Sequence, residues 1–247
     1  MSAMPDPPAG ESGDWFTATH WSIVRKAGHD ATQVARDALE KLCLIYWTPL
    51  YGYVRRKGHD EHEAQDLTQE FFTRLLARKD FAGLDPSRGR FRAFLLASMN
   101  HFLAKEWRKE STLKRGGGQA ALPLDTVVAE QCYHSQAGLQ LTPEKLFDRS
   151  WAETTLERAA ARLRAEFAAD GREQIFRELN VFLSTPAGAG DYTAIAARLN
   201  LSDAAVAKTV ERLRRRYRDL VREEIAQTVT STKELDEEMR YLLEVLT

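Results

Sequence analysis

Apolar residues recur every three or four positions over most of the chain, which is the spacing of helices with one buried side. Val34, Ala38 and Leu42 form one such set, and the same spacing continues to about residue 110. No stretch alternates apolar and polar residues as a strand would. We therefore predict an all-α fold that begins with a helical bundle over residues 15–110.

Composition divides the remainder of the chain into four parts. Residues 1–14 are rich in Pro, Gly, Ser and Asp, which predicts a disordered tail. Residues 111–145 contain three consecutive glycines and two prolines and lose the helical spacing, so we predict a flexible linker. Helical spacing returns over residues 146–226, the second predicted domain. Residues 227–247 predict an acidic amphipathic helix, which either packs against the protein or acts as a partner-docking or self-masking segment.

Charge and cysteine usage limit the classes of partner and compartment. The net charge is −1 over 247 residues, so any nucleic-acid surface must be local and balanced by acidic residues elsewhere. Cys43 and Cys132 lack metal-ligand spacing, which favours free thiols in a reducing compartment. The first residues resemble no signal peptide, and no apolar run approaches the roughly 20 residues of a membrane span. We expect a cytoplasmic protein with no membrane partner.

Residues 91–109, FRAFLLASMNHFLAKEWRK, predict a helix with two different sides. One side carries Phe91, Leu95 and Met99 and is expected to be buried. The other carries basic and small residues that would admit phosphates, with aromatic rings on which unpaired bases could stack. A helix of this kind is also common as an ordinary solvated surface element. The candidate nucleic-acid contacts are Arg90, Phe94, Asn100, His101, Lys105 and Arg108.

Residues 192–216, YTAIAARLNLSDAAVAKTVERLRRR, fit a helix-turn-helix more specifically. Asn200 suits a left-handed turn, and Ser202 suits the N-cap of the second helix, whose Val206 and Val210 face inward. A recognition helix enters the major groove through its first turns, although a plain helical hairpin would share much of this pattern. The candidate duplex contacts are Ser202, Ala205, Lys208, Thr209, Arg212, Arg215 and Arg216.

The sequence contains no clear catalytic, metal-binding or cofactor motif. The stretch HDEHEAQD at residues 59–66 lacks the spacing of a zinc protease helix, and an acidic helix start explains it more simply. The glycines at 116–118 lack the Gly-Lys-Ser/Thr ending of a phosphate-binding loop. We therefore expect a protein that is not an enzyme and needs no cofactor or metal.

Three stretches together resemble a bacterial RNA polymerase sigma factor of the extracytoplasmic-function (ECF) type, within the sigma-70 family. EAQDLTQEFFTRLL, residues 63–76, is similar to the helix that docks on the polymerase. Residues 91–109 look like the promoter-melting helix, and residues 192–216 look like the reader of the upstream promoter element. The likeness covers about residues 20–110 and 150–222.

The resemblance implies a sigma-2-like helical bundle, a sigma-4-like helix-turn-helix domain and three kinds of contact. Core RNA polymerase would be bound through the clamp helices of its β′ subunit, and an anti-sigma factor is a further partner that the family admits. The 91–109 helix would hold an unpaired strand of the downstream promoter element, while the second helix of the helix-turn-helix would read the upstream element as duplex. The docking residues would be Asp66, Leu67, Gln69, Glu70 and Phe71.

The chain departs from the family at positions that bear on promoter choice. Asn100-His101 stands where the family often has Arg-Asn, and Ala207 and Thr209 stand where it often has basic residues, so no promoter sequence is implied. Two alternatives stay open: a stand-alone helix-turn-helix regulator that binds duplex DNA without polymerase, and a helical interaction protein whose acidic end binds a partner. Residues 63–76 distinguish a sigma factor from a stand-alone regulator, because such a regulator needs no docking helix.

Overall fold

The structure is a computed structural model that describes most of the chain. The described ranges are 20–27, 32–77, 90–110, 125–136, 138–186, 188 and 190–247, without the side chains of 25–27 and 108–110. Every regular element in these ranges is a helix, which confirms the all-α prediction. The chain forms two compact units, one from residues 1–151 and 226–247 and the other from residues 152–225. The predicted tail at 1–14 lies outside the described residues.

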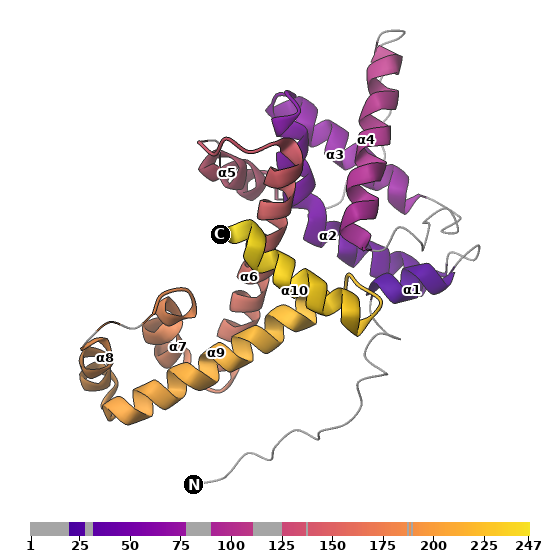
Figure 1. The fold of residues 1–247 in the computed structure, drawn as a ribbon. Helices are drawn as coiled ribbons and strands as arrows, with labels where there is room; N and C mark the ends of the chain where they lie inside the picture. Colours follow the sequence, from indigo (N-terminus) through magenta and orange to yellow (C-terminus); the bar gives the residue numbers. More distant parts are fainter. Residues whose placement is uncertain are drawn as a thin grey trace. The chain divides into compact units, whose positions relative to one another are not determined.

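Unit 1 is organised around one long helix. Its helices are α1 (His20–Ala27), α2 (Gln33–Arg56), α3 (Glu61–Leu76), α4 (Phe91–Glu110), α5 (Thr126–Gln136), the start of α6 (Pro143–Ala169) and α10 (Thr232–Leu246), as drawn in Figure 1. Of these, α2 contacts α1, α3, α4 and α5. Its N-cap is Thr32, whose hydroxyl accepts a hydrogen bond from the Ala35 N–H, and its middle and C-terminal half are almost wholly buried.

Aromatic side chains fill the core of unit 1. The Phe91 ring lies 4.9 Å from the Trp21 ring and 5.2 Å from the Tyr46 ring, between centroids. The Phe71 and Phe102 rings meet nearly edge to face at 5.7 Å and join α3 to α4. Such pairs add about 0.5–1.5 kcal/mol each beyond the burial of their area. Rigid ring contacts therefore hold α3 and α4 against α2.

The predicted linker contains a helix, so the prediction of a flexible segment is wrong for residues 126–136. Glu130 of α5 accepts hydrogen bonds from the Arg55 guanidinium at 2.8 and 3.1 Å and from the Tyr51 hydroxyl. Burial acts to raise the pKa of Glu130, but Arg55 and Tyr51 outweigh it and hold the pKa below its usual range. These contacts fasten α5 to α2, although the α5 sequence itself shows no strong helical period.

Unit 2 is a separate helical layer packed on the second half of α6. It contains α7 (Glu173–Leu179), the short 3₁₀ helix η3 (Asn180–Leu183), α8 (Asp191–Leu199) and nearly all of α9 (Asp203–Ala226). Val206 and Val210 of α9 are buried as the sequence predicts, and Leu213 is buried with them. Ion pairs join α9 to α6, since Arg158 and Arg162 both bond the Glu224 carboxylate, at 2.9 and 2.8 Å.

Candidate polymerase-docking and nucleic-acid surfaces

The α3 helix presents an acidic and amide-bearing outer surface. Asp60 caps its N-terminus by accepting a hydrogen bond from the Glu63 N–H at 2.8 Å, and acidic residues suit the positive end of the helix. Asp66 is exposed and Gln69 is half-buried, and neither has a polar partner among the residues that the structure describes. The predicted docking residue Phe71 is buried against Phe72 and Phe102, so its assignment to the surface is wrong.

Glu70 and Leu67, two further predicted docking residues, have neighbours of their own. The Glu70 carboxylate pairs with Arg74 at 2.6 Å, and Arg74 also pairs with Glu106 of α4 at 2.5 Å. The Arg74 guanidinium lies over the Phe102 ring at 5.1 Å. Glu70 is therefore part of a bridge between α3 and α4, and only part of its charge is available to a partner. Leu67 lines a surface depression with residues of α4.

The α4 helix divides into two sides much as predicted, with one error. Asn100, His101 and Lys105 are exposed. Phe94 was predicted as a stacking surface for bases, but its side chain is 8% exposed and stacks on Trp21 of α1 at 6.0 Å. That prediction is wrong, because α1 covers this part of the helix. The side chain of Arg108 lies outside the described residues.

A depression of about 460 Å³ opens beside the exposed face of α4. Burial raises the pKa of the Tyr53 hydroxyl, which stays protonated and donates to Asn100 Oδ1 at 2.6 Å. The Asn100 amide NH₂ is then the group left to donate to a ligand. Trp107 at the rim is 75% exposed. The lining residues are Lys57, His59, Leu67, Asn100, Leu103, Ala104, Glu106 and Trp107.

The turn between α2 and α3 also contributes to this depression, which the sequence pattern did not indicate. Lys57 and His59 come from that turn, and His59 was considered only within an acidic helix start. The Lys57 ammonium pairs with Glu144 at 3.4 Å and lies 5.1 Å from the centre of the Tyr53 ring. The depression thus combines an apolar floor, an exposed indole, an amide and two basic side chains, which suits a flat, polar-edged ligand such as a nucleobase.

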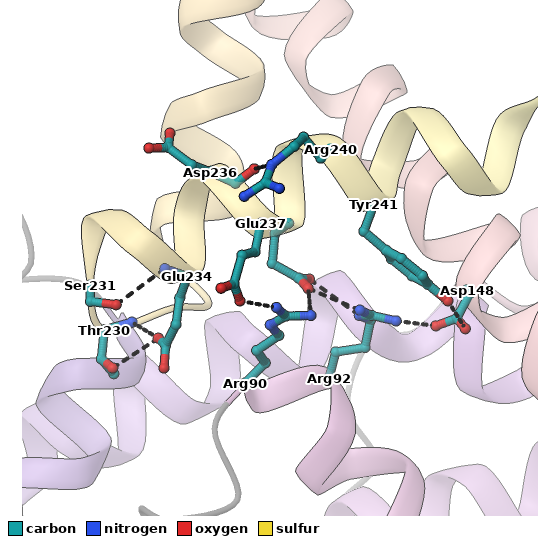
Figure 2. A network of polar contacts seen from close by, with 11 residues as sticks. Arg90, Arg92, Asp148, Thr230, Ser231, Glu234, Asp236, Glu237, Arg240 and Tyr241 are labelled. Atoms are coloured by element: carbon teal, nitrogen blue, oxygen red, sulfur yellow. Dashed lines mark hydrogen bonds and ion pairs between the residues drawn. The ribbon is translucent and has the colours of Figure 1, made fainter.

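Arg90, a predicted DNA contact, is engaged by the C-terminal helix (Figure 2). Its guanidinium lies 2.5 Å from a Glu237 oxygen and 2.7 Å from a Glu238 oxygen. Arg92 bonds Glu238 with two nitrogens, at 2.9 and 3.2 Å, and also pairs with Asp148. Arg90 is therefore paired with two carboxylates in this structure, and its contact with a phosphate stays a prediction.

The turn of the helix-turn-helix has the predicted geometry. Asn200 adopts the left-handed conformation with φ 52° and ψ 47°. The Ser202 hydroxyl accepts a hydrogen bond from the Ala205 N–H at 3.2 Å and so caps α9. Asp203 in the first turn accepts a hydrogen bond from the Thr193 hydroxyl at 2.5 Å, which joins α9 to α8. The confirmed features are local ones, fixed by residues close together in the sequence.

The outer face of α9 carries a basic stripe with fewer members than predicted. Lys208, Arg212 and Arg215 are exposed and without a polar partner among the described residues. Arg216 instead pairs with Glu166 of α6 at 2.6 Å and with Glu223 at 3.0 Å. These two carboxylates compete with a DNA phosphate for its charge. The Thr209 hydroxyl donates to the Ala205 carbonyl at 2.8 Å. Arg216 and Thr209, both predicted to contact DNA, therefore lie beside the stripe and have polar partners within unit 2.

Within the described ranges, no three His, Cys, Asp or Glu side chains are grouped so that they could hold a metal ion. None of the described helices combines the length and the hydropathy that crossing a membrane requires.

Comparison with known proteins places a family on part of unit 1. Residues 46–112 match Sigma-70 region 2, a span that runs from the middle of α2 through α3 and α4. The match shows a Sigma-70 region 2 domain over this span, which is less than half of the chain. Neither the curated proteins nor the solved structures contain a match to the chain.

Proposed function

We propose that the chain is a non-catalytic transcription initiation factor of the ECF type, which binds core RNA polymerase and directs it to specific promoters. The observation that carries the proposal is the match of residues 46–112 to Sigma-70 region 2. This span holds both the acidic surface of α3 and the open face of α4. A stand-alone helix-turn-helix regulator would need neither surface, so the polymerase-dependent function is favoured.

In this proposal, the α3 surface around Asp66 and Gln69 binds the clamp helices of the β′ subunit. The Asp66 carboxylate is exposed, so its charge is available to steer a basic partner. The Glu70–Arg74–Glu106 bridge sets the position of α3 on α4 beside this surface. The Phe71 side chain is buried and supports this surface from the core of unit 1.

The α4 helix holds the separated strand of the downstream promoter element. Lys105 supplies a cation for the phosphates, and a base in the depression would stack on Trp107 and meet the Asn100 amide. Contacts of this kind exist only when the base has left the duplex. They therefore shift the equilibrium of the complex toward melted DNA.

The α9 helix reads the upstream element as duplex DNA. Lys208, Arg212 and Arg215 recur at intervals of four and three residues, which places them on one side of the helix. The first turns of α9 enter the major groove, as in other helix-turn-helix proteins. In this proposal Arg212 contacts base edges and Arg215 contacts phosphates, and both side chains are exposed.

The test is retention of purified core polymerase by the immobilised full-length chain. Replacing both Asp66 and Gln69 by Ala is expected to weaken retention about tenfold, since side chains that matter at an interface cost more than roughly 1 kcal/mol when truncated. Glu40→Gln is the matched control, because Glu40 is an exposed carboxylate of α2 away from this surface. Unchanged retention in the double variant would refute the docking assignment. Failure of the wild type to support promoter-dependent run-off transcription would refute the function.

A further inference from the structure

The segment that follows α9 is built into unit 1. The Gln227 carbonyl accepts a hydrogen bond from the Trp21 N–H at 3.0 Å, and its side-chain oxygen accepts one from the His20 N–H at 3.2 Å. The Thr228 carbonyl lies 3.4 Å from the Phe91 nitrogen and accepts its N–H. The first N–H groups of a helix lack partners within the helix. Two adjacent residues thus accept hydrogen bonds from N–H groups at the starts of both α1 and α4. They lie a few residues before α10, which begins at Thr232.

Figure 2 shows the ion pairs between α10 and the start of α4. Their exposures divide them into an inner and an outer layer. In the inner layer, Glu238 is 1% exposed and Arg92 is 12% exposed, and the Arg92 guanidinium lies between the Trp151 and Tyr241 rings at 4.7 and 4.5 Å. In the outer layer, Glu237 is 35% exposed and Arg90 is 28% exposed. The inner layer fastens the helix, whereas the outer pair remains within reach of a ligand from solution.

Among the described residues of this network, the charges at the start of α4 do not sum to a positive value. Arg90 and Arg92 contribute two positive charges, while Glu237, Glu238 and Asp148 contribute three negative ones, which leaves −1. The positive end of the α4 dipole would favour an anion here, and the nearby carboxylates pair with the two arginines. A phosphate that approached Arg90 would have to displace Glu237 or tolerate its charge.

We propose that Glu237 competes with the backbone phosphate of promoter DNA for Arg90 and thereby limits how strongly α4 holds the separated strand. The inference rests on the proposed function, because it assumes that α4 meets DNA. Glu237 acts from a helix that stays docked, since the inner layer and the contacts of Gln227 and Thr228 do not involve it. When Glu237 is removed, Arg90 keeps one bond to Glu238 and gains a free side for the phosphate.

The experiment measures binding of the full-length chain to a fluorescent, random-sequence single-stranded DNA by anisotropy, over a range of salt. Glu237→Gln is expected to bind about threefold more tightly at low salt, the factor for removing one like charge about 6 Å from a phosphate in water. The gain should shrink as added salt shortens the screening length. Glu244→Gln is the matched control, because Glu244 is an exposed carboxylate of α10 with the same charge and no contact to Arg90.

A double variant separates competition for Arg90 from a general change of charge. The gain from Glu237→Gln should vanish when Arg90 is also replaced by Ala, because there is then no guanidinium to release. A gain that persists without Arg90, or one that Glu244→Gln reproduces, would overturn the inference, as would no gain at all. Suppose that the wild type binds the strand and that Lys105→Ala weakens this binding. If Glu237→Gln then changes nothing, only this inference is refuted, and the proposed function is not. If neither the wild type nor Glu237→Gln binds the strand, the proposed role of α4 falls with it.

Discussion

Replacing Glu238 by Ala is the most direct way to ask whether the C-terminal helix supports the candidate promoter-melting helix. The Glu238 carboxylate is almost completely buried and bonds two arginines, Arg90 and Arg92. Burial acts to lower the pKa of Arg92, but Glu238 and then Asp148 outweigh it and raise the pKa. Arg92 therefore stays charged, and the variant leaves a buried cation with half of its partners.

The size of the loss follows from what remains around Arg92. Removing one partner of a buried ion pair costs roughly 3–5 kcal/mol of unfolding free energy. Asp148 still pairs with Arg92, and the Trp151 and Tyr241 rings still flank it. We therefore expect a loss at the lower end of that range, about 3 kcal/mol. Glu238→Gln keeps the side-chain size and removes the charge, so its loss should be smaller.

Tryptophan fluorescence provides an assay specific to unit 1. The chain has five tryptophans, and all of them lie within residues 1–151, which belong to unit 1. Selective excitation of tryptophan during urea unfolding therefore follows unit 1 without a contribution from unit 2. Linear extrapolation of that transition gives the unfolding free energy of each variant.

Glu244→Ala is the control for this measurement, because Glu244 is exposed on the same helix. It should change the free energy of unfolding by no more than about 0.5 kcal/mol. A loss below about 1 kcal/mol for Glu238→Ala would contradict the reasoning, since an exposed or unformed pair would give such a value. Equal losses for the two variants would show that the buried pair does not set the result.

Three other predictions concern different parts of the chain. Arg212→Ala should weaken binding to a duplex promoter fragment by about 1–3 kcal/mol in a gel-shift titration, whereas Arg216→Ala should lower the melting temperature of unit 2 because it breaks the Glu166 and Glu223 pairs. The lowered pKa of Glu130 means that its stabilisation is complete above the ordinary glutamate pKa and is lost as the pH falls through the lower folded-state value. The stability difference between the wild type and Glu130→Gln should accordingly shrink between about pH 7 and about pH 3 in urea unfolding.

Features set by neighbouring residues were predictable, and features set by distant ones were not. Asn200 and Ser202 act within their own turn, so their conformation and capping followed from residue type. Phe94 looked accessible on its own helix, but Trp21, from a helix that begins 71 residues before α4, covers it. The α5 helix has little intrinsic pattern and depends on the Arg55–Glu130 contact. Periodicity shows which side of a helix is apolar, but it does not show what packs there.

The arginines show why a basic stretch alone does not locate a DNA surface. With 35 Lys and Arg residues against 36 Asp and Glu, a cation binds phosphate only where the fold has not already given it a carboxylate. Arg90 and Arg216 were both predicted to meet DNA, and both have carboxylate partners within their own units. Within the described ranges, the predicted cations without such a partner are Lys105, Lys208, Arg212 and Arg215. The candidate DNA surfaces are thus the cations that have no carboxylate partner within their own unit, and under our proposal the exposed Glu237 decides whether Arg90 joins them.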